Sequence, residues 1–267
     1  MKRKKKNGWR VVVGMLTLGI GATVARGDYP GVADTTGLVI RFDTAEGTGA
    51  VVPRAYATQE APGGNTLPFA YFGNRSEFLY QQVFAASEWA PGARTITGMA
   101  LRADTTYGYD PGFDYQATDL QFTLSTTSRG PDQLYGGSWP TGYAQNHGAD
   151  AVVVYRGPVH LTHVGGSSSI PQAFDLVIPF TRSFVFDPAL GNLLIEVRGM
   201  PDNQSTLQGL IFFDATNQLG DGTSRAFYDG TLVPEPGALL LLGSGLLWAG
   251  GLGLAAWGRP LRRSGSR

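Results

Sequence analysis

The chain contains no cysteine, and its four lysines all lie within the first six residues. Without cysteine there is no disulfide, no thiolate metal site and no cysteine nucleophile. Histidine is scarce, with three residues, and His160 and His163 are spaced so that on a strand they point to opposite faces and do not readily share a metal. No G-x-S-x-G serine motif occurs before the C-terminal tail. We therefore expect a protein that is not an enzyme.

The neutral overall charge conceals an acidic central region. Residues 28–233 contain ten arginines, no lysine and twenty carboxylates, which gives this region a net charge of about −10 although the whole chain sums to zero. Such a surface repels phosphate groups, so we expect no nucleic-acid partner.

Residues 1–27 have the features of a signal peptide. The basic stretch MKRKKKNGWR precedes the apolar run 11–22 of 12 residues, and Ala25 and Gly27 are small. As a helix the run measures about 18 Å, short of a membrane span. We expect signal peptidase to cleave after Gly27, with cleavage after Ala25 as the alternative. An uncleaved N-terminal anchor is the other interpretation.

The middle of the chain is rich in short runs of alternating or β-branched residues separated by Gly, Pro, Asp and Asn. We predict one all-β domain over residues 28–232, an antiparallel β-sandwich of the jelly-roll kind. LPFAYFG at 67–73 is among the expected strands. The tyrosine-rich segment 105–118 is expected to be a long loop.

A C-terminal span follows. Residues 238–257 contain 20 residues without a charge, about 30 Å as a helix, which matches the hydrocarbon core of a bilayer. The segment 258–267 then carries Arg259, Arg262, Arg263 and Arg267. By the positive-inside rule these arginines stay in the cytoplasm and the domain faces outward. A permanent membrane anchor would explain these features equally well.

The residues just before the span favour a second interpretation, a sorting signal in place of a permanent anchor. Val233-Pro234-Glu235-Pro236-Gly237, the apolar span and the arginine-rich end, together residues 233–267, resemble the PEP-CTERM sorting signal of Gram-negative bacteria. The resemblance implies recognition at Pro234, Glu235 and Pro236 by exosortase, a membrane cysteine protease-transpeptidase, and a link to exopolysaccharide and biofilm. Two prolines also keep this stretch extended, a conformation that an enzyme cleft can bind.

Two sets of side chains in the domain are candidate binding residues. Aromatic residues able to stack on sugar rings are Tyr107, Tyr109, Tyr115 and Trp139. Oxygen ligands suited to calcium lie in two acidic segments, as Asp104, Asp110 and Asp114 and as Asp214 and Asp221. Neither segment has EF-hand spacing, and aspartate is an ordinary turn residue, so calcium is a secondary expectation.

These observations predict an exported, non-catalytic protein of the cell envelope or extracellular matrix. Its precursor would sit in the inner membrane with the domain outside and the C-terminus in the cytoplasm, before reaching the cell surface or medium. Exosortase, signal peptidase and exopolysaccharide are the expected partners. A secreted carbohydrate-binding module is the alternative. A secreted hydrolase is a third class, and it would need two facing carboxylates in a cleft.

Overall fold

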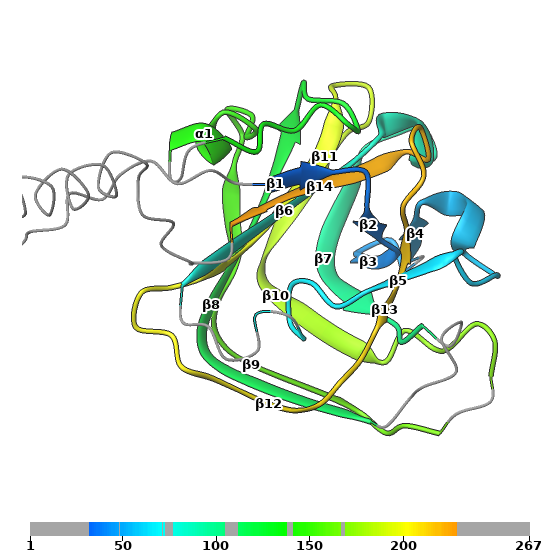
Figure 1. Ribbon diagram of the computed structural model, residues 1–267. Helices are drawn as coiled ribbons and strands as arrows, with labels where there is room; N and C mark the ends of the chain where they lie inside the picture. Colours follow the sequence, from blue (N-terminus) through cyan, green and yellow to red (C-terminus); the bar gives the residue numbers. More distant parts are fainter. Residues whose placement is uncertain are drawn as a thin grey trace, which may run out of the picture.

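A computed structural model describes residues 32–47, 49–70, 72, 77–104, 112–137, 141–166 and 169–228. Within these ranges the protein is all-β, as predicted, with one short helix, α1 (Thr141–Ala144), and two 3-10 turns, η1 (Arg54–Tyr56) and η2 (Ala86–Glu88) (Figure 1). The strands are β1 (Val32–Asp34), β2 (Gly37–Leu38), β3 (Ile40–Thr44), β4 (Ala50–Val52), β5 (Gly63–Asn65), β6 (Phe78–Phe84), β7 (Arg94–Leu101), β8 (Phe113–Thr127), β9 (Val152–His163), β10 (Leu176–Phe186), β11 (Asn192–Gly199), β12 (Ser205–Gly209), β13 (Phe213–Thr216) and β14 (Thr223–Tyr228).

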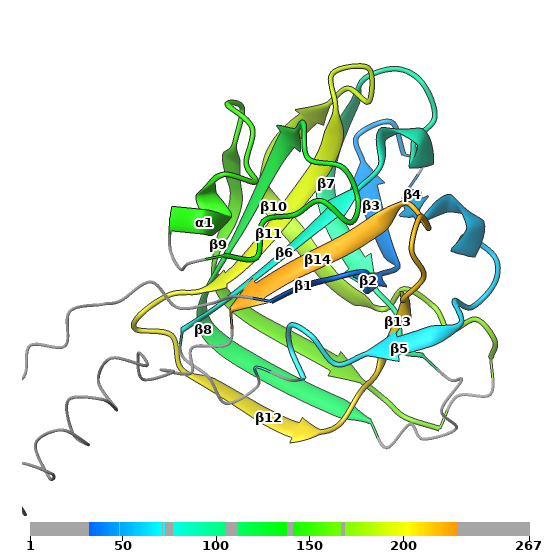
Figure 2. The ribbon, with the colours of Figure 1, turned by 45° about the horizontal axis from the view of Figure 1, so that its top comes forward.

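The strands form three antiparallel sheets. The largest has the order β1-β14-β6-β11-β8-β12, with β9 also paired to β8. A second has the order β10-β7-β3-β4, and a third the order β2-β13-β5. Figures 1 and 2 show β8 and β9 bending together and β12 lying beside one end of β8. The sheets enclose one apolar core in a sandwich-like arrangement.

The core is aromatic at its centre. Phe69 lies 5.5 Å from Tyr115, 5.9 Å from Phe213 and 6.4 Å from Phe122, measured between ring centroids. Phe122 and Leu124 on β8 both point into this core, as the period-2 alternation of a strand requires. The alternation in the sequence therefore placed these side chains on the correct face.

Strand β6, FLYQQVF, is buried on both faces, which explains why it carries apolar side chains on both sides of the strand around a central pair of buried glutamines. One face contributes Phe78, Tyr80 and Phe84 to the main core. The other face packs Leu79 and Val83 against Leu134, Tyr143 and other apolar side chains of a second, smaller cluster. Residues 128–137 and 141–151, here called the strap, supply Leu134 and Tyr143 and so cover the outer face of the large sheet.

Two sequence expectations about single elements were wrong. The described part of 67–73 is a turn, not a strand, because Pro68 has no N–H for a ladder and its carbonyl accepts instead from Phe72 N. The rings of Phe69 and Phe72 fill the core from this turn. The second half of the expected loop 105–118 is a strand, since β8 begins at Phe113.

The expected signal peptide 1–27, the motif 233–237, the span 238–257 and the tail 258–267 lie outside the described residues. Among the residues described, no helix is long and apolar enough to cross a bilayer.

Candidate functional site

The structure distributes the predicted site residues over several places. Tyr107, Tyr109, Asp110 and Trp139 lie outside the described residues, as do Val233–Gly237 and the four tail arginines. Tyr115 is fully buried between Phe69 and Phe113, and burial raises the pKa of its phenol. Its ring is therefore part of the core and offers no stacking face to a ligand at the surface.

Asp214 and Asp104 come from the two separate acidic segments and are brought near each other by the bridge between Ala103 and Phe213. Both side chains are buried. Arg102 donates from Nε to Asp214 Oδ2 at 2.7 Å and from Nη2 to the carbonyls of Tyr56 and Gln59. A guanidinium therefore occupies the position next to Asp214 that a cation would take.

Asp221 completes a turn between β13 and β14. Its carboxylate accepts from Thr216 Oγ1 at 2.6 Å and from the backbone N–H groups of Gln218 and Thr223. These bonds are the ordinary role of aspartate at a turn. In the described part of the chain no group of three acidic or histidine side chains is placed to hold a metal ion.

A buried polar cluster that sequence reasoning missed lies under the strap. His147 Nε2 is 2.8 Å from Glu196 Oε2, and His147 Nδ1 is 3.2 Å from Ser125 Oγ. Gln81 Nε2 also donates to Glu196, at 2.7 Å. Ser125 and His147 are 22 positions apart, and His147 and Glu196 are 49 positions apart, so no sequence motif could have revealed the cluster.

Serine, imidazole and carboxylate in this order are the groups of nucleophilic catalysis, but here they serve packing. Ser125 has no exposed surface, so its hydroxyl cannot meet a substrate. With the proton assigned to Nε2, His147 donates to Glu196 Oε2 and accepts from Ser125 at Nδ1, while Ser125 Oγ accepts from Gly148 N. These atoms are then paired with one another, which favours a role in packing.

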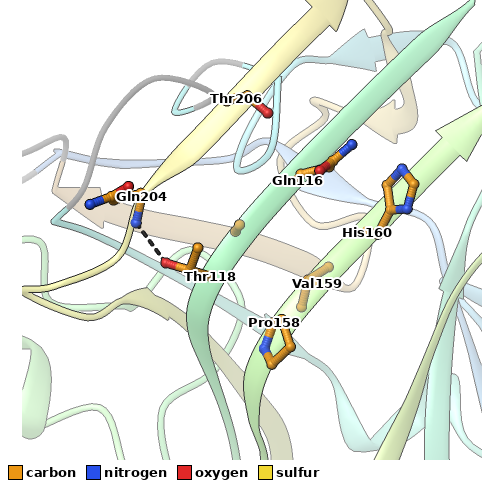
Figure 3. Close-up of a pocket in the computed structure, with 8 residues that line it drawn as sticks. Gln116, Thr118, Pro158, Val159, His160, Gln204 and Thr206 are labelled. Carbon is orange, nitrogen blue, oxygen red and sulfur yellow. Dashed lines mark hydrogen bonds between the residues drawn. The ribbon is translucent and has the colours of Figure 1, made fainter.

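A hollow of about 660 Å³ lies on the surface over β8, β9 and β12. Figure 3 shows its lining side chains, which are Gln116, Ala117, Thr118, Pro158, Val159, His160, Gln204 and Thr206. Thr206, Gln116 and His160 stand in one row, because Gln116 on β8 pairs with Thr206 on β12 and with His160 on β9. All three side chains are exposed.

A β-bulge creates the hollow. Ala117 pairs with Val159 but Leu120 pairs with Gly157, so β8 carries one extra residue at this point. Here β8 also changes partner, from β12 on one side of the bulge to β11 on the other. The sheet therefore forks at the place where the hollow lies.

Asn203 holds the bulge in shape. Its Oδ1 accepts from Thr118 N at 3.1 Å and from Asp119 N at 3.0 Å, and the side chain is almost fully buried. Gln204 N donates to Thr118 Oγ1 at 2.8 Å, the bond drawn in Figure 3. The backbone donors freed by the bulge are thus satisfied by the turn that leads into β12.

Two carboxylates near the hollow are paired with neighbouring side chains. Asp114 Oδ2 lies 3.4 Å from His160 Nε2, and Gln116 Nε2 donates to Asp114 Oδ1 at 3.3 Å. On the other side Arg156 donates twice to Asp119, which lowers the pKa of that carboxyl. Of the predicted calcium ligands that the structure describes, Asp114 is the one beside this site. The sequence signal was the outward polar alternation of 114, 116 and 118, which the loop assignment concealed.

No match was found. Neither a protein-family model, nor a curated protein, nor a solved structure is significantly similar to the chain. The fold and the hollow are therefore interpreted from their own residues.

Proposed function

We propose that this chain is an exported, non-catalytic β-domain protein of the cell envelope or extracellular matrix, sorted by its C-terminal segment 233–267. The observation that carries the proposal is the order of features in that segment: Pro234-Glu235-Pro236, then 20 uncharged residues, then four arginines. This order resembles a PEP-CTERM signal, whose partner is exosortase. Signal peptidase acts at the other end, near Gly27.

The domain between these segments supports the proposal. Its last described strand ends at Tyr228, five residues before Val233, so the motif would lie close to the folded part of the chain. The domain's net charge of about −10 favours solubility outside the cell. Its antiparallel sheets, with β1 paired to β14 from the opposite end of the domain, support the finer jelly-roll-like interpretation.

Carbohydrate binding is the second candidate function, and the hollow over β8, β9 and β12 is the observation that favours it. The uncharged amide and hydroxyl groups of Gln116, Gln204 and Thr206 are suited to hydroxyl-rich ligands. The four stacking aromatics expected from the sequence do not contribute to the described lining of this hollow.

Processing of the tail is tested by Glu235→Ala in a host with an active exosortase. The wild-type chain should lose the segment after the motif, and the variant should remain as a membrane-bound precursor about 3 kDa heavier, since a membrane span is retained by its apolar length alone. Asp202→Ala, which removes an exposed carboxylate outside the motif, is the matched control and should be processed normally. Cell fractionation and intact mass measure the outcome. A wild-type chain that keeps residues 239–267 in that host would show that the segment is an anchor.

A further inference from the structure

The lining of the hollow combines apolar carbon with uncharged polar groups. Its exposed carbon comes from Pro158, with Ala117 and Val159 almost fully buried beside it, whereas the side chains of Gln116, Gln204 and Thr206 are exposed. Among the described residues, the side-chain amide of Gln204 and the hydroxyl of Thr206 have no hydrogen-bond partner. These groups are free to bind a ligand.

The polar surface continues along the sheet beyond the hollow. The next row on the same face contains Gln208, Asp114 and Thr162, again one residue from each of β12, β8 and β9. Gln208 and Thr162 are exposed. Among the described residues, exposed polar side chains therefore extend over a second row, which suits a chain longer than one ring.

Charge restricts the class of ligand. The carboxylate of Asp114 lies 3.4 Å from His160 in the lining, and the domain as a whole is acidic. A carboxylate, sulfate or phosphate on the ligand would meet repulsion and find no unpaired cation in the lining. A ligand with many hydroxyls and no charge avoids this cost.

We propose that the hollow over β8, β9 and β12 binds a neutral polysaccharide chain. A sugar ring has an apolar C–H face and a hydroxyl edge, which suit the apolar carbon of Pro158 and the exposed polar side chains of the lining respectively. Hydroxyls donate to the carbonyl oxygens of Gln116 and Gln204 and accept from their amides and from Thr206. The proposal names the ligand of the carbohydrate-binding function given above, and it does not depend on how the chain is sorted.

Binding is measured by biolayer interferometry on the purified full chain in detergent, with dextran, laminarin, galactomannan and xylan as neutral probes and alginate as the acidic one. At least one neutral polysaccharide should bind, with little dependence on salt, and alginate should not. The double variant Gln116→Ala with Thr206→Val should weaken that binding about tenfold or more, since it removes two hydrogen-bonding side chains. All the exchanged side chains are exposed, so folding is preserved, as circular dichroism can verify.

Gln218→Ala, on the turn between β13 and β14, is the matched control and should bind like the wild type. The proposal is overturned if none of the neutral probes binds, if alginate binds in their place, or if the double variant binds as well as Gln218→Ala. Because the purified chain is tested directly, these outcomes are separate from any failure of C-terminal processing.

Discussion

Arg102 is the bulkiest of the fully buried side chains in the described residues, and its partners explain why a charge is tolerated there. It donates to Asp214 and to two backbone carbonyls, and its guanidinium lies 4.7 Å from the centroid of the Phe174 ring. Asp214 in turn accepts from Ala61 N at 2.9 Å. The pair thus connects β13 to the segment around η1 rather than acting on a ligand.

Asp214→Ala should be strongly destabilising, because it removes the oxygens that accept hydrogen bonds from the buried Arg102 guanidinium and from Ala61 N. Breaking a buried pair by removing one partner costs about 3–5 kcal/mol. Asp119→Asn, which breaks the exposed pair with Arg156, should cost no more than about 1 kcal/mol. Urea unfolding of the two variants compares these costs, and equal losses would contradict the role given to Arg102 and Asp214.

The titration of Asp214 should also change the free energy of unfolding as the pH varies. Burial raises the pKa of this carboxyl to about 6, against the opposing effect of Arg102, so the folded chain holds the proton more tightly than the unfolded chain. The resulting stabilisation is complete below the ordinary pKa near 4 and is lost as the pH rises through about 6. Urea midpoints across pH 4–7 should therefore contain a falling component that Asp214→Asn lacks. Identical profile shapes would contradict this.

At the scale of elements, the strap and the bulge modify an otherwise regular sheet. The strap covers the outer face of β6, β11 and β14 with Leu134 and Tyr143, and Tyr143 Oη donates to Phe227 O. The Gln81, His147 and Glu196 side chains are paired beneath it. The bulge at the other end of β8 leaves its outer face open. One sheet therefore has a sealed half and an accessible half (Figure 2).

Tyr143→Ala should loosen the strap before the rest of the domain. The ring is almost fully buried, and truncating a large buried aromatic costs about 3–5 kcal/mol. Amide hydrogen exchange should rise first in residues 128–151, with β8 and β11 less affected. Gln145→Ala, an exposed position on the same segment, is the control and should change neither stability nor exchange. Uniform acceleration across all strands would show that the strap is not a separate unit.

At the scale of the whole molecule, the distribution of lysine offers a direct test of export. All four lysines precede residue 7, so a chain cleaved after Gly27 retains one primary amine, its new α-amino group. Labelling protein collected outside the cell with an amine-reactive reagent should add one label per chain, and intact mass spectrometry counts it. Cleavage after Ala25 would give the same count with a heavier chain. More than one label would mean that the leader is retained.

Some features followed from local sequence, because their physical causes are local. The alternation at 119–127 placed Phe122 and Leu124 in the core, and the three-residue spacing put exposed His160 and buried His163 on opposite faces of β9, as expected. The all-β class followed from the turn residues between such runs. The leader, the sorting motif and the span were also inferred from local composition, and they remain predictions.

Other features depended on contacts between residues far apart in the chain, which no local pattern encodes. The segment around Pro68 is a turn whose two described phenylalanines, Phe69 and Phe72, fill the core with residues from distant strands. Tyr115 was expected to stack on sugar rings, but it lies in the core, because β8 begins at Phe113 and turns this side chain inward. Asp214 was one of the candidate calcium ligands, and in the structure it contacts Arg102, 112 positions away. The hollow requires β12 beside β8 and a bulge held by Asn203, about 85 positions from its partners. Pairing and burial place these residues together, and only the tertiary structure decides both.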